Sequence, residues 1–393
     1  MLECHNEYSD AIENDKNVDI IFYDIAKAFD SINHNILLTK LYNVGISGSL
    51  LGWIESFLTN RNFRVIVNNT FSNVYEAPSG VPQGTILGPL LFNFYISSLS
   101  NFDINEIVIE LFADGLKSFI VYKKHESTDP LQNFISKFAD WCALNKLKVA
   151  ADKCFVLHLG KNNPNRQYYF NNTPIKKENL VRDLGLMTNS NLKWNDQFDL
   201  MCTKAYGRLF SLFRAVRSND PHFLFRMYKT YVRPILEFGT AIACPIYKKE
   251  IFKIEKVQKT AVNIIYYRSL KYKYPTKPPY LDILKLHNSN TLEFRRHIND
   301  LVLYHKIKYG IIKVHENCLP KFCTPTSIRG VRGAPFIPFC KTNIRYNFFL
   351  NRIGRIYAKL PCNFVNEPCI PTFKTQLIRL NQNTVESPYS PPL

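Results

Sequence analysis

Two apolar stretches constrain the fold of this chain more than any other feature: one is followed directly by an aspartate, and the other contains an aspartate near its middle. Residues 18–23 (VDIIFY) predict a buried strand that ends at Asp24. Residues 106–122 (EIVIELFADGLKSFIVY) predict two apolar strands joined at Asp114-Gly115, because Asp-Gly is favoured in tight hairpin turns. If these strands are neighbours, the carboxylates of Asp24 and Asp114 converge at one edge of a sheet.

Such a pair of aspartates has two interpretations. Hard divalent cations such as Mg²⁺ prefer oxygen ligands, and two-metal phosphoryl or nucleotidyl transfer uses paired aspartates. Each aspartate alone also has an ordinary structural explanation, because aspartate commonly ends strands and Asp-Gly forms turns. The pair is therefore a candidate metal site that needs support from other motifs.

The segments between and after these strands predict the rest of an α+β unit. Helical periodicity occupies residues 32–42 and 47–58, and a hairpin is expected at residues 64–67 and 73–76. Ser127 or Thr128 caps a helix, and a further strand follows at residues 154–159. The apolar stripe of that helix comprises Leu131, Phe134, Ile135, Phe138, Trp141 and Cys142. The order predicts an antiparallel sheet with helices on one face.

The net charge changes sign along the chain. Residues 1–160 contain 12 Lys and Arg against 18 Asp and Glu, a net charge of −6, whereas residues 161–393 contain 38 against 14, a net charge of +24. This excess favours a polyanionic partner, most often nucleic acid, although a ribosomal-type or tail-like basic surface explains it equally well. Periodicity in the basic part predicts helices at residues 194–216, 221–238, 249–267, 289–309 and 348–358.

Composition excludes several classes of protein. With 46% hydrophobic and 21% charged residues, the chain is neither disordered throughout nor of low complexity. The longest apolar run, residues 85–99, contains Gly88 and Pro89 and is too short for a bilayer, so we expect no membrane partner. The ten cysteines lack CxxC spacing and zinc-ligand neighbours, which favours free thiols in an intracellular protein, nuclear or cytoplasmic.

One loop is more specific than the rest. Residues 79–84 (SGVPQG) precede an apolar helix; their glycines allow the backbone to approach a flat partner, and Gln83 offers both a donor and an acceptor. The loop is not a P-loop, because it lacks Gly-Lys-Ser/Thr. A rigid connector is the alternative interpretation.

In this order and spacing, the segments resemble the reverse transcriptases of non-LTR retrotransposons, the LINE-type, jockey-like enzymes of insects. Residues 22–31 (FYDIAKAFDS) resemble motif A, residues 79–84 motif B, and residues 112–115 (FADG) motif C. The similarity covers residues 9–380. Further matches are residues 147–154 with motif D, residues 183–186 (DLGL) with motif E, and residues 228–239 (YKTYVRPILEFG) with the thumb and connection region.

The resemblance implies an RNA-directed DNA polymerase that adds deoxynucleotides (from dNTPs) to a primer 3′-hydroxyl with two Mg²⁺ ions. Asp24 and Asp114 would hold the metal ions, and Lys153 would lie near the triphosphate. Phe29 would reject a ribose 2′-hydroxyl, unless it is an ordinary core residue, and Lys153 is otherwise a solvated lysine. The expected template and nucleotide contacts are Phe29, Gly80, Pro82, Gln83 and Gly84. Basic helices would bind the RNA template and the RNA–DNA duplex.

The resemblance also implies a division of the chain. Residues 1–160 would be the palm, without the fingers that precede motif A in the family, and residues 161–192 a junction that carries motif E. Residues 193–270 would form a helical thumb, and residues 271–393 a basic C-terminal extension. The fold class is thus an α+β reverse-transcriptase palm followed by a mostly helical region.

Departures from the family pattern argue against full activity. Gly115 replaces the second aspartate of motif C, the segment before Asp24 is too short to include the fingers, and Ala150 replaces the usual asparagine of motif D. Loss of a well-placed charge costs about 10²–10³-fold in rate. We therefore expect weak or absent polymerase activity, as in a fragment of a decayed mobile element. A catalytically dead nucleic-acid-binding relic is the alternative.

Overall fold

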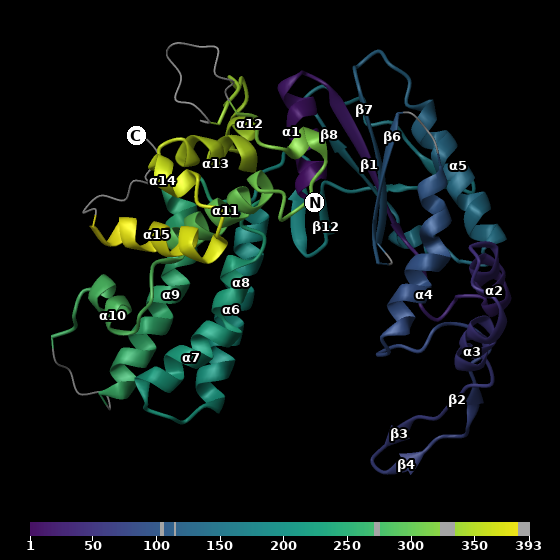
Figure 1. The fold of residues 1–393 in the computed structure, drawn as a ribbon, viewed down its shortest axis with the longest axis horizontal. Coiled ribbons are helices and arrows are strands. Elements are labelled where there is room, and N and C mark those ends of the chain that lie inside the picture. The colour runs from purple at the N-terminus through teal and green to yellow at the C-terminus, as the bar shows by residue number, and fades with distance from the viewer. Residues whose placement is uncertain (103–105, 114, 271–275, 323–334, 384–393) are drawn as a thin grey trace. The chain divides into compact units, whose positions relative to one another are not determined.

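The structure, a computed structural model, describes residues 1–102, 106–113, 115–270, 276–322 and 335–383 (Figure 1). Its internal contacts divide the chain into two compact units. We call Asp15–Val181 the sheet unit, and Met1–Asn14 with Arg182–Leu393 the helical unit. This boundary follows contacts alone, so the four-segment division expected from the family resemblance stays a prediction.

The sheet unit is built around a five-stranded sheet in the order β11-β8-β1-β7-β6. All neighbouring strands are antiparallel except β11, which is parallel to β8. The strands are β1 (Asn17–Asp24), β6 (Ile107–Phe112), β7 (Gly115–Tyr122), β8 (Phe155–Leu159) and β11 (Lys176–Lys177). The helices are α2 (His34–Asn43), α3 (Gly48–Leu58), α4 (Leu87–Ile96) and α5 (Asp129–Leu144), with the short η1 (Ser97–Asn101) and η2 (Ala151–Lys153). Because β1 is the central strand and Asp24 is its last residue, Asp24 lies midway along the edge of the sheet formed by the strand ends.

The core of the sheet unit lies between the sheet and helices α4 and α5, which cover one of its faces (Figure 1). Side chains alternate along a strand, so Ile21 and Tyr23 of β1 both point into this core. The ring of Tyr23 packs edge-on against Phe138 of α5, with centroids 4.8 Å apart. The apolar stripe expected on this helix is buried as predicted.

A buried carboxylate lies in this same layer. Asp19 of β1 is fully buried and bonded to four side chains: His158 Nδ1 at 2.7 Å, Tyr168 at 2.6 Å, Tyr122 at 3.0 Å and Asn163 at 2.7 Å. Burial acts to raise the pKa of Asp19, but His158 and the other donors outweigh it and lower that pKa. The network ties β1 to β7, to β8 and to the segment that leads to β11.

The predicted hairpin between α3 and α4 pairs differently from expectation. Instead of residues 64–67 pairing with residues 73–76, β2 (Asn62–Phe63) pairs with β5 (Tyr75–Glu76), and β3 (Ile66–Val67) pairs with β4 (Thr70–Phe71). Asn68 and Asn69 form the tip with φ of 48° and 61°. Asparagine tolerates this left-handed region, so the Asn-Asn pair sets the turn and hence the register.

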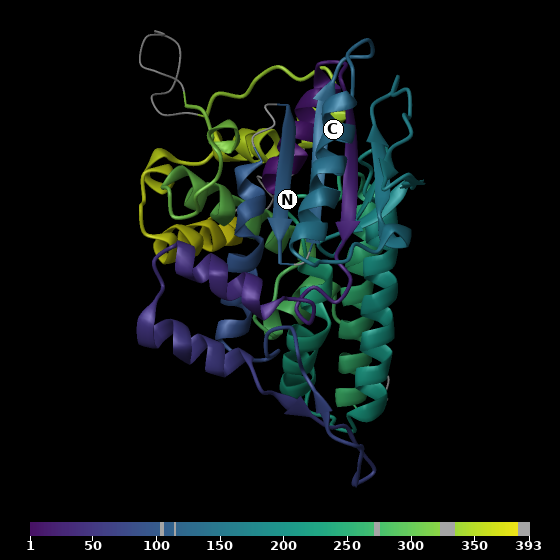
Figure 2. The same ribbon diagram turned by 90° about the vertical axis from the view of Figure 1, so that its right-hand side faces the viewer.

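The helical unit contains long helices of the basic part of the chain, and α6 and α9 run side by side (Figure 2). Its first three helices after the junction are α6 (Asn195–Ala215), α7 (Pro221–Tyr231) and α8 (Arg233–Glu237). The others are α9 (Lys248–Ser269), α10 (Tyr280–Leu286), α11 (Leu292–Lys308), η3 (Glu316–Cys318), α12 (Asn343–Asn347), α13 (Phe349–Tyr357), α14 (Cys362–Val365) and α15 (Ile370–Asn383). Two short hairpins precede these helices in the chain. The first, β9 (Tyr169–Phe170) with β10 (Thr173–Pro174), belongs to the sheet unit, and the second, β12 (Leu180–Asp183) with β13 (Leu186–Asn189), contains the boundary between the units.

One predicted helix is divided in two. Residues 221–238 were expected to form a single helix, but α7 ends at Tyr231 and α8 begins at Arg233. Pro234 has no N–H to donate to the carbonyl four residues earlier, and its ring crowds that carbonyl, which explains the break. The expected start is confirmed: the Asp220 side chain accepts hydrogen bonds from the backbone N–H groups of His222 and Phe223, at 3.0 and 3.3 Å.

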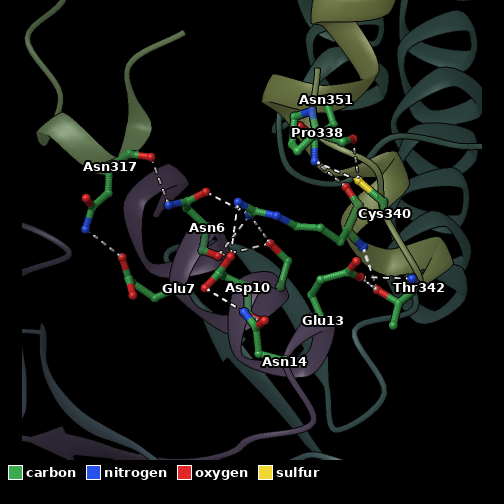
Figure 3. A network of polar contacts seen from close by, with 12 residues as sticks. Asn6, Glu7, Asp10, Glu13, Asn14, Asn317, Pro338, Cys340, Thr342 and Asn351 are labelled. Atoms are coloured by element: carbon green, nitrogen blue, oxygen red, sulfur yellow. Dashed lines mark hydrogen bonds and ion pairs between the residues drawn. The ribbon is translucent and has the colours of Figure 1, made fainter. Parts of the chain in front are cut away.

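The first helix, α1 (Leu2–Glu13), belongs to the helical unit and is held there by polar contacts (Figure 3). The guanidinium of Arg345 donates to Asn6 Oδ1 and to Ser9 Oγ, both at 2.9 Å, and lies 3.4 Å from Asp10. The carboxylate of Glu13 accepts from the Thr342 hydroxyl at 2.7 Å. Helix α1 and residues of α12, more than 300 positions later, therefore share one folded unit.

Within the described part of the chain, no helix combines the length and apolar character needed to cross a bilayer.

Candidate active site at the end of strand β1

The end of β1 brings two predicted catalytic residues together. Beyond the strand, the backbone continues to pair with residues 148–150: Ala26 N–H donates to the Lys148 carbonyl at 2.8 Å, and Ala150 N–H donates to the Asp24 carbonyl at 2.9 Å. This pairing leads directly into η2, whose last residue is Lys153. The Lys153 ammonium lies 3.4 Å from Asp24 Oδ2.

This ion pair is open to solvent. The side chains of Lys153 and Asp24 are 65% and 41% exposed. Exposed ion pairs contribute about 0–1 kcal/mol, so either partner can exchange its contact for a ligand at little cost. The ammonium of Lys153 and the carboxylate of Asp24 therefore lie at one accessible edge, and the ion pair between them is weak enough to be replaced by contacts with a ligand.

On the other side of β1, Asp24 lies opposite Gly115, the first residue of β7. Phe112 also pairs with Gly115, so β6 and β7 are joined by residues 113 and 114. Asp114 itself lies outside the described residues. The turn was expected at Asp114-Gly115; the positive φ of 51° belongs to Ala113, and Gly115 lies outside that region.

The motif B loop is attached to motif A through its backbone. Gly80 N–H donates to the Ile32 carbonyl at 2.8 Å, and Val81 N–H donates to the Phe29 carbonyl at 2.9 Å. Gly80 has φ of 83°, and a Cβ on it would lie 2.7 Å from Asp30 Cα. Only glycine fits both the conformation and this close approach. The Gly-Val step of motif B therefore docks on the turn that carries Phe29.

The carbonyl oxygen of Gly80 has two side-chain donors that sequence reasoning did not find. His34 Nε2 lies 2.8 Å from this oxygen, and Arg61 Nη2 donates to it at 2.7 Å. Arg61 also donates from Nε to the Leu58 carbonyl at the end of α3. Neither residue carries a local motif signal, because each acts across tens of residues of sequence.

Gln83 is oriented by a residue of motif A. Its Nε2 donates to Asp30 Oδ1 at 2.9 Å, and the Ser79 hydroxyl donates to the Asp30 carbonyl at 2.8 Å. Both Gln83 and Asp30 are exposed. Asp30 was not singled out from the sequence as a site residue, although it lies in the AFDS segment of motif A.

The remaining predicted contacts surround this junction. The partly buried ring of Phe29 stacks on Phe92 of α4, with centroids 4.3 Å apart and planes 23° from parallel. Pro82 presents its carbonyl to Gly88, where a Cβ would lie 2.7 Å from that oxygen. Gly84 has φ of 79° and no atom within 4 Å of an added Cβ. Phe29 is thus both packed and partly accessible, which fits either interpretation of it.

Burial raises the pKa of two thiols beneath this edge. Burial raises the pKa of Cys154, and the nearby charge of Asp24 adds to that effect. Burial likewise raises the pKa of Cys142 to about 12. Because the thiolate is the nucleophilic form, the chemistry of this edge depends on oxygen and ammonium groups.

Comparisons with known proteins agree with this geometry. Residues 4–199 match the family model described as "Reverse transcriptase (RNA-dependent DNA polymerase)". The chain is 24% identical over 258 residues to the "Probable RNA-directed DNA polymerase from transposon X-element" of Drosophila melanogaster, across 62% of this chain and 28% of that protein. It is 31% identical over 155 residues to the "RNA-directed DNA polymerase from mobile element jockey" of Drosophila funebris, across 37% of this chain and 16% of that protein.

A solved telomerase from Candida tropicalis, in complex with a fragment of telomeric RNA, aligns with 96% of this chain and 52% of its own, at 10% identity and a TM-score of 0.39. A similarity this weak supports no argument about the present chain. The sequence alignments span less than a third of the lengths of the two insect relatives.

The sheet, its aspartate-ended central strand and the motif B loop define a palm of the nucleic-acid polymerase class. More particularly, residues 4–199 are a reverse transcriptase domain, of the kind found in the RNA-directed DNA polymerases of non-LTR retrotransposons. The match confirms the family and the α+β fold class that the motifs predicted. The individual roles assigned to Asp24, Asp114, Lys153, Phe29 and Gln83 stay predictions.

Proposed function

We propose that this chain is the polymerase core of a non-LTR retrotransposon reverse transcriptase, and that Gly115 makes it slow. It extends a primer on an RNA template with dNTPs and holds the resulting RNA–DNA duplex. The observation that carries the proposal is the edge formed by Asp24 and Lys153, 3.4 Å apart and open to solvent. Because both charges are accessible, the edge can exchange its internal ion pair for a metal-bound triphosphate.

The donor chemistry of Asp24 suits a hard cation, since its carboxylate is accessible and Mg²⁺ prefers oxygen ligands. The described residues contain no group of three or more His, Cys, Asp or Glu that could hold a metal ion by themselves. Asp24 would hold Mg²⁺ together with Asp114, as the resemblance implies. When bound, Mg²⁺ would increase the acidity of the primer 3′-hydroxyl and neutralise the charge that develops on the departing pyrophosphate.

Other residues of the site bind and orient the reactants. Lys153 is a mobile positive charge that moves from Asp24 to the triphosphate when nucleotide binds. Gln83 positions the incoming nucleotide, and its amide is oriented by Asp30. Phe29 excludes a 2′-hydroxyl by size, because stacking on Phe92 limits the movement of its ring.

The test is primer extension on a primed RNA template with dNTPs and Mg²⁺. We expect weak, Mg²⁺-dependent synthesis by the unmodified chain and a loss of at least about 10²-fold for Asp24→Asn. The matched control is Asp152→Asn, which removes an exposed carboxylate from the same short helix as Lys153 and should change the rate less than threefold. Equal rates for the two variants would contradict the proposal.

A second candidate function is nucleic-acid binding without catalysis. It is supported by the net charge of +24 in residues 161–393 together with Gly115 in motif C. Binding of an RNA–DNA duplex should then weaken steeply with salt, with a log–log slope near −0.9 for each phosphate contacted. Salt-sensitive binding without synthesis, in both the unmodified chain and Gly115→Asp, would favour this candidate over the polymerase.

A further inference from the structure

The helical unit contains a cavity of about 440 Å³ that takes no part in the candidate active site. Its walls come from α1, from the start of α6, from the start of α9 and from α12 with the residue that follows it. This volume is within the range of specific small-ligand sites, about 300–1,000 Å³. The cavity can therefore hold a group larger than a few waters, and its lining indicates which group.

Rigid contacts keep the walls apart. Arg345 of α12 is bonded to Asn6 and Ser9 of α1, and its guanidinium lies 5.3 Å from the centre of the Phe348 ring. The Glu13 carboxylate is bonded to Thr342, which caps α12. These contacts fix the spacing between α1 and α12, so the space between them does not close by collapse of one helix on the other.

The lining combines flat aromatic surfaces with amides. The aromatic residues are Trp194, Phe198, Tyr247 and Phe348. Asn195, Asn343 and Asn347 supply side-chain amides, each with both donors and an acceptor. A nucleobase presents the complementary features, because it has a flat face for stacking and an edge of mixed donors and acceptors.

The charges at the cavity favour a ligand with an attached anion. Lys193 and Lys249 line it, and neither forms an ion pair with another residue that the structure describes. Glu250 also lines it, but its carboxylate accepts hydrogen bonds from the backbone N–H groups of Ile246 and Tyr247, at 3.1 and 3.3 Å. The acid is thus engaged at the start of α9. The Lys249 ammonium lies 5.9 Å from the centre of the Tyr247 ring, so this positive charge lies beside an aromatic wall of the cavity.

A second, more polar pocket of about 280 Å³ shares Asn195, Phe198, Lys249 and Glu250 with the cavity. It adds Lys253, which is ion-paired with Asp199. The two pockets together provide an aromatic-lined cavity beside a smaller pocket lined by Lys249, which forms no ion pair within the described residues. A nucleotide unit has this same division into a flat base and a phosphate.

We propose that the cavity binds one unpaired nucleobase of a single strand, with Lys249 contacting the adjoining phosphate. The proposal rests on a nucleic-acid partner, as the proposed function does, but not on catalysis. An acidic peptide with an aromatic anchor is the other ligand that such a lining admits. Nucleic acid is favoured because residues 161–393 carry a net charge of +24, which attracts an extended polyanion.

The test is equilibrium binding of a fluorescein-labelled ten-nucleotide RNA to the full chain, without Mg²⁺ or dNTPs. The matched probe is an abasic oligomer with the same sugar–phosphate backbone. Tyr247→Ala should weaken binding of the base-bearing RNA about tenfold and leave binding of the abasic oligomer within twofold, because only a base can stack on the aromatic ring. Tyr247 is 57% exposed, so its loss should leave the fold intact.

Two controls separate base recognition from general attraction. Phe252→Ala removes an equally exposed ring of α9 that does not line the cavity, and it should change neither affinity. Lys249→Ala should weaken binding of both oligomers equally and reduce the slope of log affinity against log salt concentration by about one. Tyr247→Ala should leave that slope unchanged.

Three outcomes would overturn the proposal. Tyr247→Ala could leave RNA affinity unchanged, or it could weaken binding of the RNA and of the abasic oligomer equally. The third is displacement of the labelled RNA by an acidic aromatic peptide but not by unlabelled RNA. Base-dependent binding by a chain that fails to extend primers would reject the polymerase and leave this site in place. The two proposals therefore fail separately.

Discussion

Asp24 and Gly115 face each other across the antiparallel strands β1 and β7, at the edge of the sheet where catalysis is proposed. The family resemblance places a second motif C carboxylate at position 115, next to Asp114. The strand register therefore positions the missing charge directly opposite the aspartate that would hold the metal. This relationship is the structural basis for the slow polymerase proposed above.

Restoring that carboxylate should restore activity. We predict that Gly115→Asp increases Mg²⁺-dependent primer extension by about 10²–10³-fold, because a well-placed charge contributes that much to the rate. A Cβ at position 115 would meet only the Phe112 carbonyl, at 3.3 Å, and φ lies outside the left-handed region, so the strand should accommodate the side chain after a small shift. Gly115→Ala is the matched control and should not raise the rate. Equal rates for both variants would argue against a role for this carboxylate.

The glycines of motif B should differ in their tolerance of substitution. Gly80→Ala should lower the free energy of unfolding by about 2–4 kcal/mol, because it combines a strained φ with overlap against the Asp30 backbone. Gly84→Ala has a similar φ but open space around the new Cβ, so it isolates the conformational cost, about 1 kcal/mol. Urea unfolding of both variants measures the difference. Similar losses would show that the Gly80–Asp30 contact is unimportant.

The buried Asp19 network should make stability depend on pH. The folded-state pKa of Asp19 is lowered, so its contribution is complete above the unfolded pKa and is lost as pH falls through the folded pKa. We predict that Asp19→Asn lowers the free energy of unfolding at pH 7. The free energies of unfolding of the variant and the unmodified chain should converge as pH decreases below about 4. Urea titrations between pH 7 and pH 3 test this. A constant difference across that range would refute it.

The contacts of Arg345 should determine whether α1 stays docked. Arg345→Ala removes hydrogen bonds to Asn6 and Ser9 and the ion pair with Asp10, so we predict hydrogen exchange in residues 2–13 that is about 10–100-fold faster. Lys341→Ala is the charge-matched control, because Lys341 bonds Glu13 through its backbone N–H and not through its ammonium. Equal exchange rates in the two variants would exclude Arg345 as the anchor of α1.

Local patterns predicted many of the elements. The buried apolar run of β1, the apolar stripe of α5 and the Asp220-Pro221 start of α7 are all present where the sequence indicated them. Each feature depends on residues that are close in sequence, so hydrophobic periodicity and capping residues were sufficient to predict it. The separation of α7 from α8 could have been expected from Pro234, whose effect is also local.

Other features could not be obtained in this way. The helix α1 was not predicted, because what fixes it is contact with Asn317 and Arg345, over 300 positions later. The donors His34 and Arg61 on Gly80, and the acceptor Asp30 for Gln83, have no sequence pattern of their own. The register of β2 to β5 was also missed, since the Asn68-Asn69 turn sets it.

The sequence by itself determined the motif order, the position of Asp24 at the end of a strand, and the charge asymmetry that favours a polyanionic partner, because these depend on residue type and spacing alone. Only the tertiary structure decided that Asp24 lies opposite Gly115, that Lys153 reaches Asp24, and that residues from α1, α6, α9 and α12 enclose one cavity. Those relationships arise when distant segments pack together, and packing depends on side-chain shape in three dimensions, which no local pattern encodes.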